Sequence, residues 1–128
     1  MIKSFCVVLV TKNLEQQLTF YKDIIGLEEF FNQDNTIGLG YDNRLHIVLR
    51  AEYNPNSHHQ QENKGPIIIT FQVEEESKDL IMSRLVKEGH TIRDTLALPQ
   101  YDSEYIFIED VDGNELCLDV KREGSTYI

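Results

Sequence analysis

The stretch Tyr105 to Val120, YIFIEDVDGNELCLDV, organises the predicted fold of this chain. Two apolar-rich runs flank a central cluster of turn-forming residues, Asp110 to Asn114, so the stretch is typical of a β-hairpin whose connection contains a glycine. After the turn, Leu116 and Leu118 alternate with polar or sulfur-bearing residues, which indicates a strand with two unlike faces. We therefore predict a sheet with one core face and one face that is available for function.

The composition indicates one compact globular chain. It has 128 residues, of which 41% are hydrophobic and 27% charged, as is usual for a soluble protein. No apolar run approaches the roughly 20 residues needed to cross a bilayer, so we expect no membrane partner. The apolar run 4–10 is followed by Lys12 and Asn13 rather than by a small-residue cleavage site, which argues against a secretory signal. Cys6 and Cys117 are predicted to be buried within strands in a reducing cytosol, so we expect a cytoplasmic protein.

The net charge of −10 excludes one class of partner. A nucleic-acid-binding protein needs a basic surface that neutralises phosphates, so we expect no nucleic-acid partner. The charge is compatible with a cationic ligand, but an acidic surface is also ordinary for a protein of the cytosol.

Hydrophobic periodicity predicts five elements in the first half of the chain. They are a strand over 2–10, a helix over 13–25 and strands over 27–31, 36–41 and 44–52. Asn13 is a good N-cap residue and Gly26 is expected to end the helix. The predicted buried stripe of the helix contains Leu14, Leu18, Tyr21 and Ile25. The pairs Asp34-Asn35 and Asp42-Asn43 predict the two turns between strands.

The second half repeats this order of elements. A strand over 66–73, a helix over 77–88 ended by Gly89, a strand over 91–96 and the hairpin again give β-α-β-β-β. A polar loop over 53–65 is the expected boundary, so we predict a single domain over 1–128 built of modules of about 1–60 and 61–128. Neither half can bury its sheet alone. The modules are therefore expected to face each other within a chain or to pair across a homodimer.

Three motifs in order suggest a known family. The segment Val10 to Leu14 is followed by Phe20-Tyr21 and by Ile25-Gly26-Leu27, and the second hairpin contains Asp110 to Leu116, DVDGNEL. These segments resemble the "V-x-D-L…FY…LGL" opening and the "D-P-D-G-N-x-x-E" end of the vicinal oxygen chelate superfamily, with Val111 in place of proline. That superfamily includes glyoxalase I, extradiol dioxygenases, and fosfomycin- and bleomycin-resistance proteins. The resemblance covers residues 2 to 120 and implies an α+β fold with two curled mixed sheets around a pocket, commonly in a homodimer.

The resemblance also implies four positions for metal ligands. In metal-using members they are typically His or Gln, Glu, His and Glu, and here they fall on Cys6, near Val48, near Ile68 and on Cys117. Two of these side chains have no donor atom, and two thiolates suit a soft ion such as Cu(I) rather than Mg²⁺, Mn²⁺ or Fe²⁺. We therefore expect no metal and no other cofactor, and the glyoxalase, dioxygenase and fosfomycin-type mechanisms are disfavoured.

The predicted pocket consists of residues that share strand parity with these four positions, together with Tyr105 near the mouth. They are Cys6, His46, Val48, Arg50, Ile68, Thr70, Gln72, Tyr105, Cys117 and Asp119. Arg50 has two interpretations, because its guanidinium would hold an anionic ligand bidentately or would pair with a carboxylate such as Asp119. Cys6 and Cys117 are either small core residues or a redox pair.

These observations predict a metal-independent small-molecule-binding protein of the glyoxalase and bleomycin-resistance type. An apolar pocket with a few polar groups is the usual composition of such a site. One alternative is a lyase or isomerase of the same superfamily with a non-standard active site. A second is an antibiotic-sequestering protein, for which the acidic charge suits basic glycopeptides, although the chain has no tryptophan to stack on their rings. The sequence leaves open which ligand binds and whether a reaction occurs.

Overall fold

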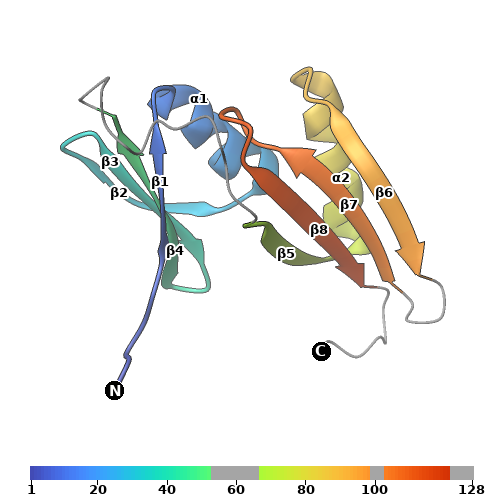
Figure 1. Ribbon diagram of the computed structural model, residues 1–128, viewed down its shortest axis with the longest axis horizontal. Helices are drawn as coiled ribbons and strands as arrows, with labels where there is room; N and C mark the ends of the chain where they lie inside the picture. Colours follow the sequence, from blue (N-terminus) through green and yellow to red (C-terminus); the bar gives the residue numbers. More distant parts are fainter. Residues whose placement is uncertain (53–66, 99–102, 122–128) are drawn as a thin grey trace. The chain divides into compact units, whose positions relative to one another are not determined.

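Two compact units make up the chain, residues Met1–Asn63 and Lys64–Ile128. The computed structural model describes residues 1–52, 67–98 and 103–121, so the polar loop expected over 53–65 lies outside the described residues. Each unit has the element order β-α-β-β-β and a four-stranded mixed sheet (Figure 1). This confirms the predicted α+β fold of two βαβββ modules.

The sheet of the first unit has the strand order β1-β4-β3-β2. Its strands are β1 (Val7–Thr11), β2 (Glu28–Gln33), β3 (Thr36–Tyr41) and β4 (Arg44–Ala51). Strand β1 runs parallel to β4, and the other neighbours are antiparallel. The first strand begins at Val7 rather than at residue 2, because the regular pairing with β4 starts with Val7 beside Ile47 and β4 is irregular before that point. Cys6 consequently precedes the strand.

Two tight turns connect β2, β3 and β4. Asp34, Asn35, Asp42 and Asn43 all have φ between 53° and 60°. Left-handed conformations at both central residues define a type I′ turn, whose twist matches that of a hairpin, and Asp and Asn tolerate this conformation better than most residues. The turns predicted from these two pairs are confirmed.

The helix of the first unit changes its geometry along its length. Its α-helical part, α1 (Leu14–Leu18), continues as a π-helical stretch, η1 (Thr19–Ile25), and the helix ends at Gly26 with φ 101°, as predicted. Its fully buried residues are Gln17, Phe20, Tyr21 and Ile24. The predicted stripe is correct for Tyr21, whereas Leu14, Leu18 and Ile25 are only half-buried. The buried face also contains a polar residue, Gln17, which a count of apolar residues ignores.

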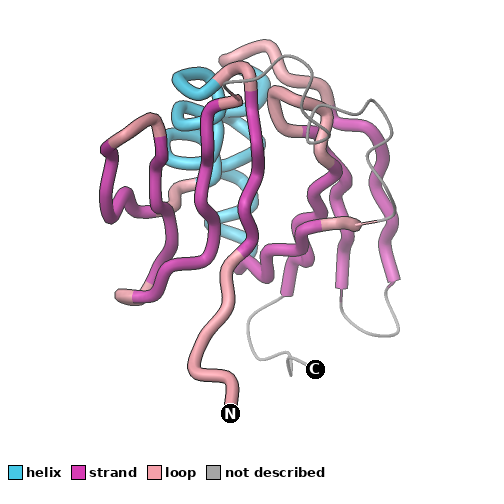
Figure 2. Tube along the Cα trace, turned by 60° about the vertical axis from the view of Figure 1, so that its left-hand side comes forward, coloured by secondary structure: helices cyan, strands magenta, loops and turns pink. Residues whose placement is uncertain are grey.

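The second unit repeats the arrangement with the strand order β5-β8-β7-β6. The strands of both units are magenta in Figure 2 and the helices are cyan. Its elements are β5 (Ile69–Glu74), α2 (Glu75–Lys87), β6 (Ile92–Leu98), β7 (Ser103–Glu109) and β8 (Glu115–Lys121). Helix α2 contacts β5 and β8, and it ends at Gly89 with φ 78°. No helix among the described residues is long and apolar enough to cross a membrane.

Alternation in each sheet separates a helix-side face from a second face, which we call the far face. In the first sheet Ile47 and Leu49 are at most 2% exposed and belong to the core with the helix residues. In the second sheet Leu116 and Leu118 are fully buried in the same way. Because successive strand residues point to opposite faces, the residues between them lie on the far faces. The predicted site residues on the strands fall on these far faces.

The predicted hairpin is present, and its connection is held by one carboxylate. Asp110 accepts hydrogen bonds at Oδ1 from the backbone N–H groups of Asp112 (3.0 Å) and Asn114 (2.8 Å). Its Oδ2 accepts a third from the side-chain amide of Asn114 at 2.8 Å. Gly113, with φ 84°, donates its N–H to the Asp110 carbonyl at 3.1 Å. The DVDGN motif is therefore a structural turn that joins β7 to β8.

Candidate functional site

The four positions predicted to correspond to metal ligands differ in their exposure. Cys6 is exposed just before β1, and Ile68 is 45% exposed just before β5. Val48 in β4 is 7% exposed and Cys117 in β8 is 4% exposed. The prediction that both cysteines are buried in strands is therefore correct for Cys117 and wrong for Cys6.

The far face of the first sheet is apolar around Val48. This residue lies between Val8 of β1 and Gly38 of β3. The ring of Phe31 covers Gly38 so closely that a Cβ added there would lie 2.2 Å from its Cε1 atom. Arg50, two residues beyond Val48, is exposed and forms no ion pair within residues 1–52. A guanidinium at the edge of an apolar surface is suited to an anionic group on an otherwise apolar ligand.

His46 is held in a defined orientation at a bulge of β4. The register between β3 and β4 shifts so that Leu39 faces Ile47 while Gly40 faces residue 45, which leaves His46 as the extra residue. The His46 ring stacks on Tyr41, with centroids 4.1 Å apart and planes at 6°. Its Nδ1 lies 2.8 Å from the carbonyl oxygen of residue 44. Because a carbonyl oxygen only accepts, Nδ1 carries the proton and Nε2 is an acceptor in the neutral ring.

A hollow of about 840 Å³ opens beside His46 within the first unit. Its volume lies within the range of roughly 300–1,000 Å³ that is usual for small-molecule sites. It is lined by Ile2, Lys3, Ser4, Phe5, Cys6, Arg44, Leu45 and His46. The hollow thus brings together two predicted site residues, Cys6 and His46, while Val48 and Arg50 are not part of its lining. Lys3 was not predicted, because the N-terminal segment was interpreted as a strand. Arg44 was not predicted either, although it begins β4 and has the same strand parity as His46.

Five predicted site residues share the far face of the second sheet. The register places Cys117 beside Thr70 of β5, and it places Asp119 between Gln72 of β5 and Tyr105 of β7. Directly opposed residues of neighbouring strands point to the same face, so these side chains form one surface. Strand parity had grouped Thr70 with Gln72 and Cys117 with Asp119, whereas Tyr105 was predicted separately, near the mouth of the pocket.

A buried ion pair on that face was not predicted. Lys121 Nζ lies 3.4 Å from Asp119 Oδ1, and their side chains are 5% and 9% exposed. Oδ1 of Asp119 receives no hydrogen bond from any residue that the structure describes. The ion-pair partner of Asp119 is thus Lys121, which lies two residues further along β8 and therefore points to the same face. The attraction between the two opposite charges offsets the free-energy cost of removing each of them from water.

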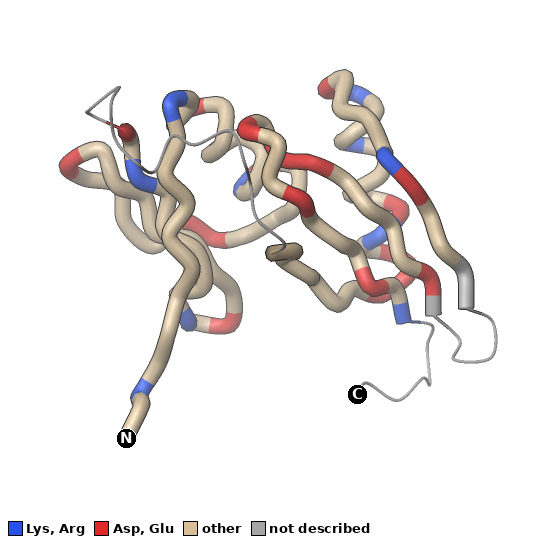
Figure 3. The backbone as a smooth tube through the Cα atoms, in the orientation of Figure 1, with Lys and Arg blue, Asp and Glu red and all other residues tan. Residues whose placement is uncertain are grey.

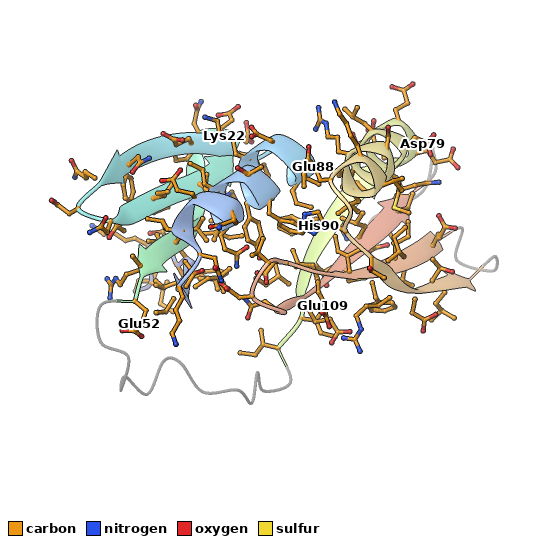
Figure 4. All side chains as sticks on the ribbon, turned by 90° about the horizontal axis from the view of Figure 1, so that it is seen from above. Lys22, Glu52, Asp79, Glu88, His90 and Glu109 are labelled. Carbon is orange, nitrogen blue, oxygen red and sulfur yellow. The ribbon has the colours of Figure 1, made fainter. Side chains whose placement is uncertain are left out.

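A smaller hollow of about 320 Å³ lies on the same face of this sheet, because its lining residue Phe107 is opposed to Cys117 and to Asp94. Its lining also contains Arg93 and Glu115. Arg93 Nη1 is 3.0 Å from Oε1 of Glu109 and 3.8 Å from Oε1 of Glu115. Glu109 is labelled in Figure 4. The positive charge in this hollow is therefore compensated by two carboxylates.

Comparison with known proteins identifies the family. Residues 5–118 match the model of the Glyoxalase/Bleomycin resistance protein/Dioxygenase superfamily. The chain belongs to this superfamily. No curated protein matches it.

Several solved structures of the superfamily have the same fold. One is the fosfomycin resistance protein FosX from Listeria monocytogenes complexed with Mn(II) and sulfate, with 18% identity and TM-score 0.74 over 94% of this chain and 92% of that chain. A glyoxylase/bleomycin resistance protein/dioxygenase domain from Frankia sp. EAN1pec has 23% identity and TM-score 0.73, covering 97% and 95% of the two chains. Lactoylglutathione lyase from Agrobacterium tumefaciens has 17% identity and TM-score 0.67, covering 93% and 94%. At these identities the similarity shows the fold.

The donor chemistry of this superfamily member does not fit a divalent metal. Val48 and Ile68 contain only carbon in their side chains. Burial, together with the negative charges of Asp119 and Glu115, raises the pKa of the Cys117 thiol to about 11. A thiol that is protonated at neutral pH is a poor ligand and a poor nucleophile. Among residues 1–52, 67–98 and 103–121, no group of three or more His, Cys, Asp or Glu side chains is arranged to hold an ion.

Proposed function

We propose that this chain is a metal-independent small-molecule-binding protein of the glyoxalase and bleomycin-resistance type. The observation that carries the proposal is the replacement of donors by carbon at Val48 and Ile68, within a superfamily whose fold the chain shares. A Lewis-acid site needs three or four protein N, O or S donors around an open position. The two remaining positions supply an exposed thiol, Cys6, and the protonated thiol of Cys117.

Elemental analysis of protein purified without chelator tests the metal-independent part. We expect far less than one Mn, Fe, Ni or Zn per chain. The Cys6→Ser/Cys117→Ser double variant is the matched control, because any metal lost in it was held by sulfur. Stoichiometric Mn, Fe, Ni or Zn in the parent chain would overturn the proposal, and its loss in the double variant would identify the thiols as ligands.

The binding part is tested by screening metabolites and antibiotics against metal-free protein by thermal shift. A ligand that uses the far face of the first sheet should lose stabilisation in the Arg50→Gln variant. The Lys87→Gln variant, which removes the same charge from the exposed end of α2, should leave it unchanged. If no ligand distinguishes these two variants, Arg50 is not part of the site.

A second candidate is a lyase or isomerase with a non-standard active site. The orientation of His46 favours it, since an imidazole whose Nδ1–H is bound to a carbonyl presents Nε2 as a general base. A reaction would be detected as turnover of a ligand found in the screen, lost in the His46→Gln variant. If the ligands bind but are not converted, the enzyme candidate is rejected and only the binding function is supported.

The net charge of −10 supports a third candidate, sequestration of a basic antibiotic such as bleomycin. Expression in sensitive cells should then raise their resistance to bleomycin, and unchanged sensitivity would dismiss the idea.

We also propose that the chain is a single cytoplasmic domain that forms a homodimer. The exposed apolar side chains of Leu80 and Val86 on α2 support the dimer, because apolar surface of this kind is usually covered. Light scattering coupled to gel filtration would give the mass of a monomer if the dimer does not form.

A further inference from the structure

The hollow of the first unit differs in charge from the rest of the protein. Among the residues that the structure describes, its lining contains three basic side chains, Lys3, Arg44 and His46, and no carboxylate. The whole chain has 22 acidic and 12 basic residues. The segment before α1 contributes to this difference, because residues 1–13 contain no Asp or Glu (Figure 3). The hollow is therefore locally basic although the net charge of the protein is −10, so the net charge does not predict the charge of this site.

The two permanent cations of the hollow have no ion-pair partner in the part of the chain that the structure describes. Within residues 1–52 neither Lys3 nor Arg44 forms an ion pair, whereas Lys22 is paired with Glu29 at 3.3 Å. Arg93 in the smaller hollow likewise has two carboxylates. At physiological ionic strength, charges beyond about 8 Å are largely screened, so the nearby cations rather than the distant carboxylates determine the sign that a bound ligand meets.

The remaining lining supplies an apolar wall and one oriented polar atom. Ile2 and Phe5 are 86% and 84% exposed, and Leu45 is half-buried. A ligand that covers such side chains gains roughly 25 cal/mol for each Å² of apolar surface removed from water. His46 uses Nδ1 on the carbonyl of Arg44, so Nε2 is the ring atom left for a ligand.

We propose that this hollow binds small organic anions, with a carboxylate, sulfonate or phosphonate at Lys3 and Arg44 and an apolar body against Ile2, Phe5 and Leu45. The proposal rests on the proposed small-molecule-binding function and names the ligand class. It reverses the expectation from net charge, which favours a cationic ligand. Arg44 provides a planar donor group suited to two oxygens of such an anion.

Three naphthalene derivatives with the same ring test the charge preference on the full, metal-free chain. They are naphthalene-1-sulfonate, 1-naphthalenemethanol and 1-naphthylmethylammonium, and their dissociation constants are measured by NMR titration, with the His46 ring signals as the local probe. We expect the sulfonate to bind most tightly and to shift the His46 signals. The Arg44→Gln and Lys3→Gln variants should each weaken it about fivefold, as expected for one exposed charge interaction.

Arg93→Gln is the matched control, because it removes the same charge from the compensated hollow and should change the affinity less than twofold. Tighter binding of the ammonium compound, or equal sulfonate binding in Arg44→Gln, would overturn the anion preference while leaving the small-molecule function in place. If none of the three compounds binds, the hollow is not a site for such ligands. The proposed function is then judged separately, by the Arg50-dependent thermal-shift screen.

Discussion

Replacing Gly40 by alanine is expected to destabilise the first unit strongly, whereas the same change at Gly38 is expected to be mild. A Cβ on Gly40 would lie 1.8 Å from the carbonyl oxygen of Arg44 and 3.0 Å from His46 Nδ1. Real Cβ contacts essentially never fall below 3.0 Å, so the backbone of β4 would have to move by about 1.2 Å, the difference between 3.0 Å and 1.8 Å. Forcing extra volume into a packed site costs about 1–3 kcal/mol, and the obstacle here is backbone, so we expect about 3 kcal/mol.

At Gly38 the obstacle is different in kind. The added Cβ would meet the ring of Phe31 at 2.2 Å, but that ring is the free end of a side chain that is 36% exposed. The ring can rotate away, and alanine gains about 0.5 kcal/mol by restricting the unfolded chain. We expect a net loss of about 1 kcal/mol at this position.

Urea unfolding followed by circular dichroism measures both free energies of unfolding, and thermal unfolding gives an independent value. For a chain of this length, 3 kcal/mol corresponds to a decrease of about 12 °C in Tm. The Gly40→Ala variant should also lose the NMR signature of the His46 Nδ1–H hydrogen bond, whereas Gly38→Ala should keep it. Equal stability of the two variants would refute the argument that the close approach of β4 to Gly40 fixes the bulge.

Three further predictions concern the second unit and the two thiols. At pH 8 iodoacetamide should alkylate Cys6 long before Cys117, because the Cys117 pKa of about 11 leaves only about one molecule in a thousand with a thiolate at that position. The alkylation rate of Cys117 should rise with pH up to that value. Equal rates for the two cysteines at pH 8, measured by mass spectrometry, would contradict this. Lys121→Met should cost about 3 kcal/mol by leaving Asp119 buried without its cation, and adding Asp119→Asn should recover part of the loss, so strictly additive losses in urea unfolding would argue against the pair. Asp110→Ala removes the acceptor of three hydrogen bonds and should cost about 2 kcal/mol, and a variant as stable as the parent would show that the turn does not need its carboxylate.

Local signals in the sequence were sufficient for most of the fold. The two Asp-Asn pairs indicated turns because few other residues tolerate positive φ, and Gly26 and Gly89 indicated helix ends for the same reason. Strand parity also predicted which residues share a face within β5 and within β8, since the period of two is a property of any strand. The position of Thr70 beside Cys117 depends on the pairing of these two strands, which parity alone does not give.

The features that were not predicted depend on contacts between distant segments. The bulge at His46 arises from the fit of β3 to β4, so periodicity in β4 alone could not locate it. The exposure of Cys6 depends on where the partner strand stops being regular, and an apolar run gives no such information. The burial of Gln17 and of the Asp119–Lys121 pair follows from packing that overrides the usual preference of polar residues for water.

The connectivity of the first sheet has a consequence for the order in which it forms. Strands β2, β3 and β4 are joined by two-residue turns, whereas β1 pairs with β4 between residues as distant as Val7 and Ile47. Hairpins close within microseconds, while pairing across a long loop is slower because of its entropy cost. The meander should therefore gain hydrogen-exchange protection before residues 7–11 during refolding, and earlier protection of β1 would contradict this order. The basic hollow, lined by the segment that precedes β1, would then be the last part of the unit to assemble.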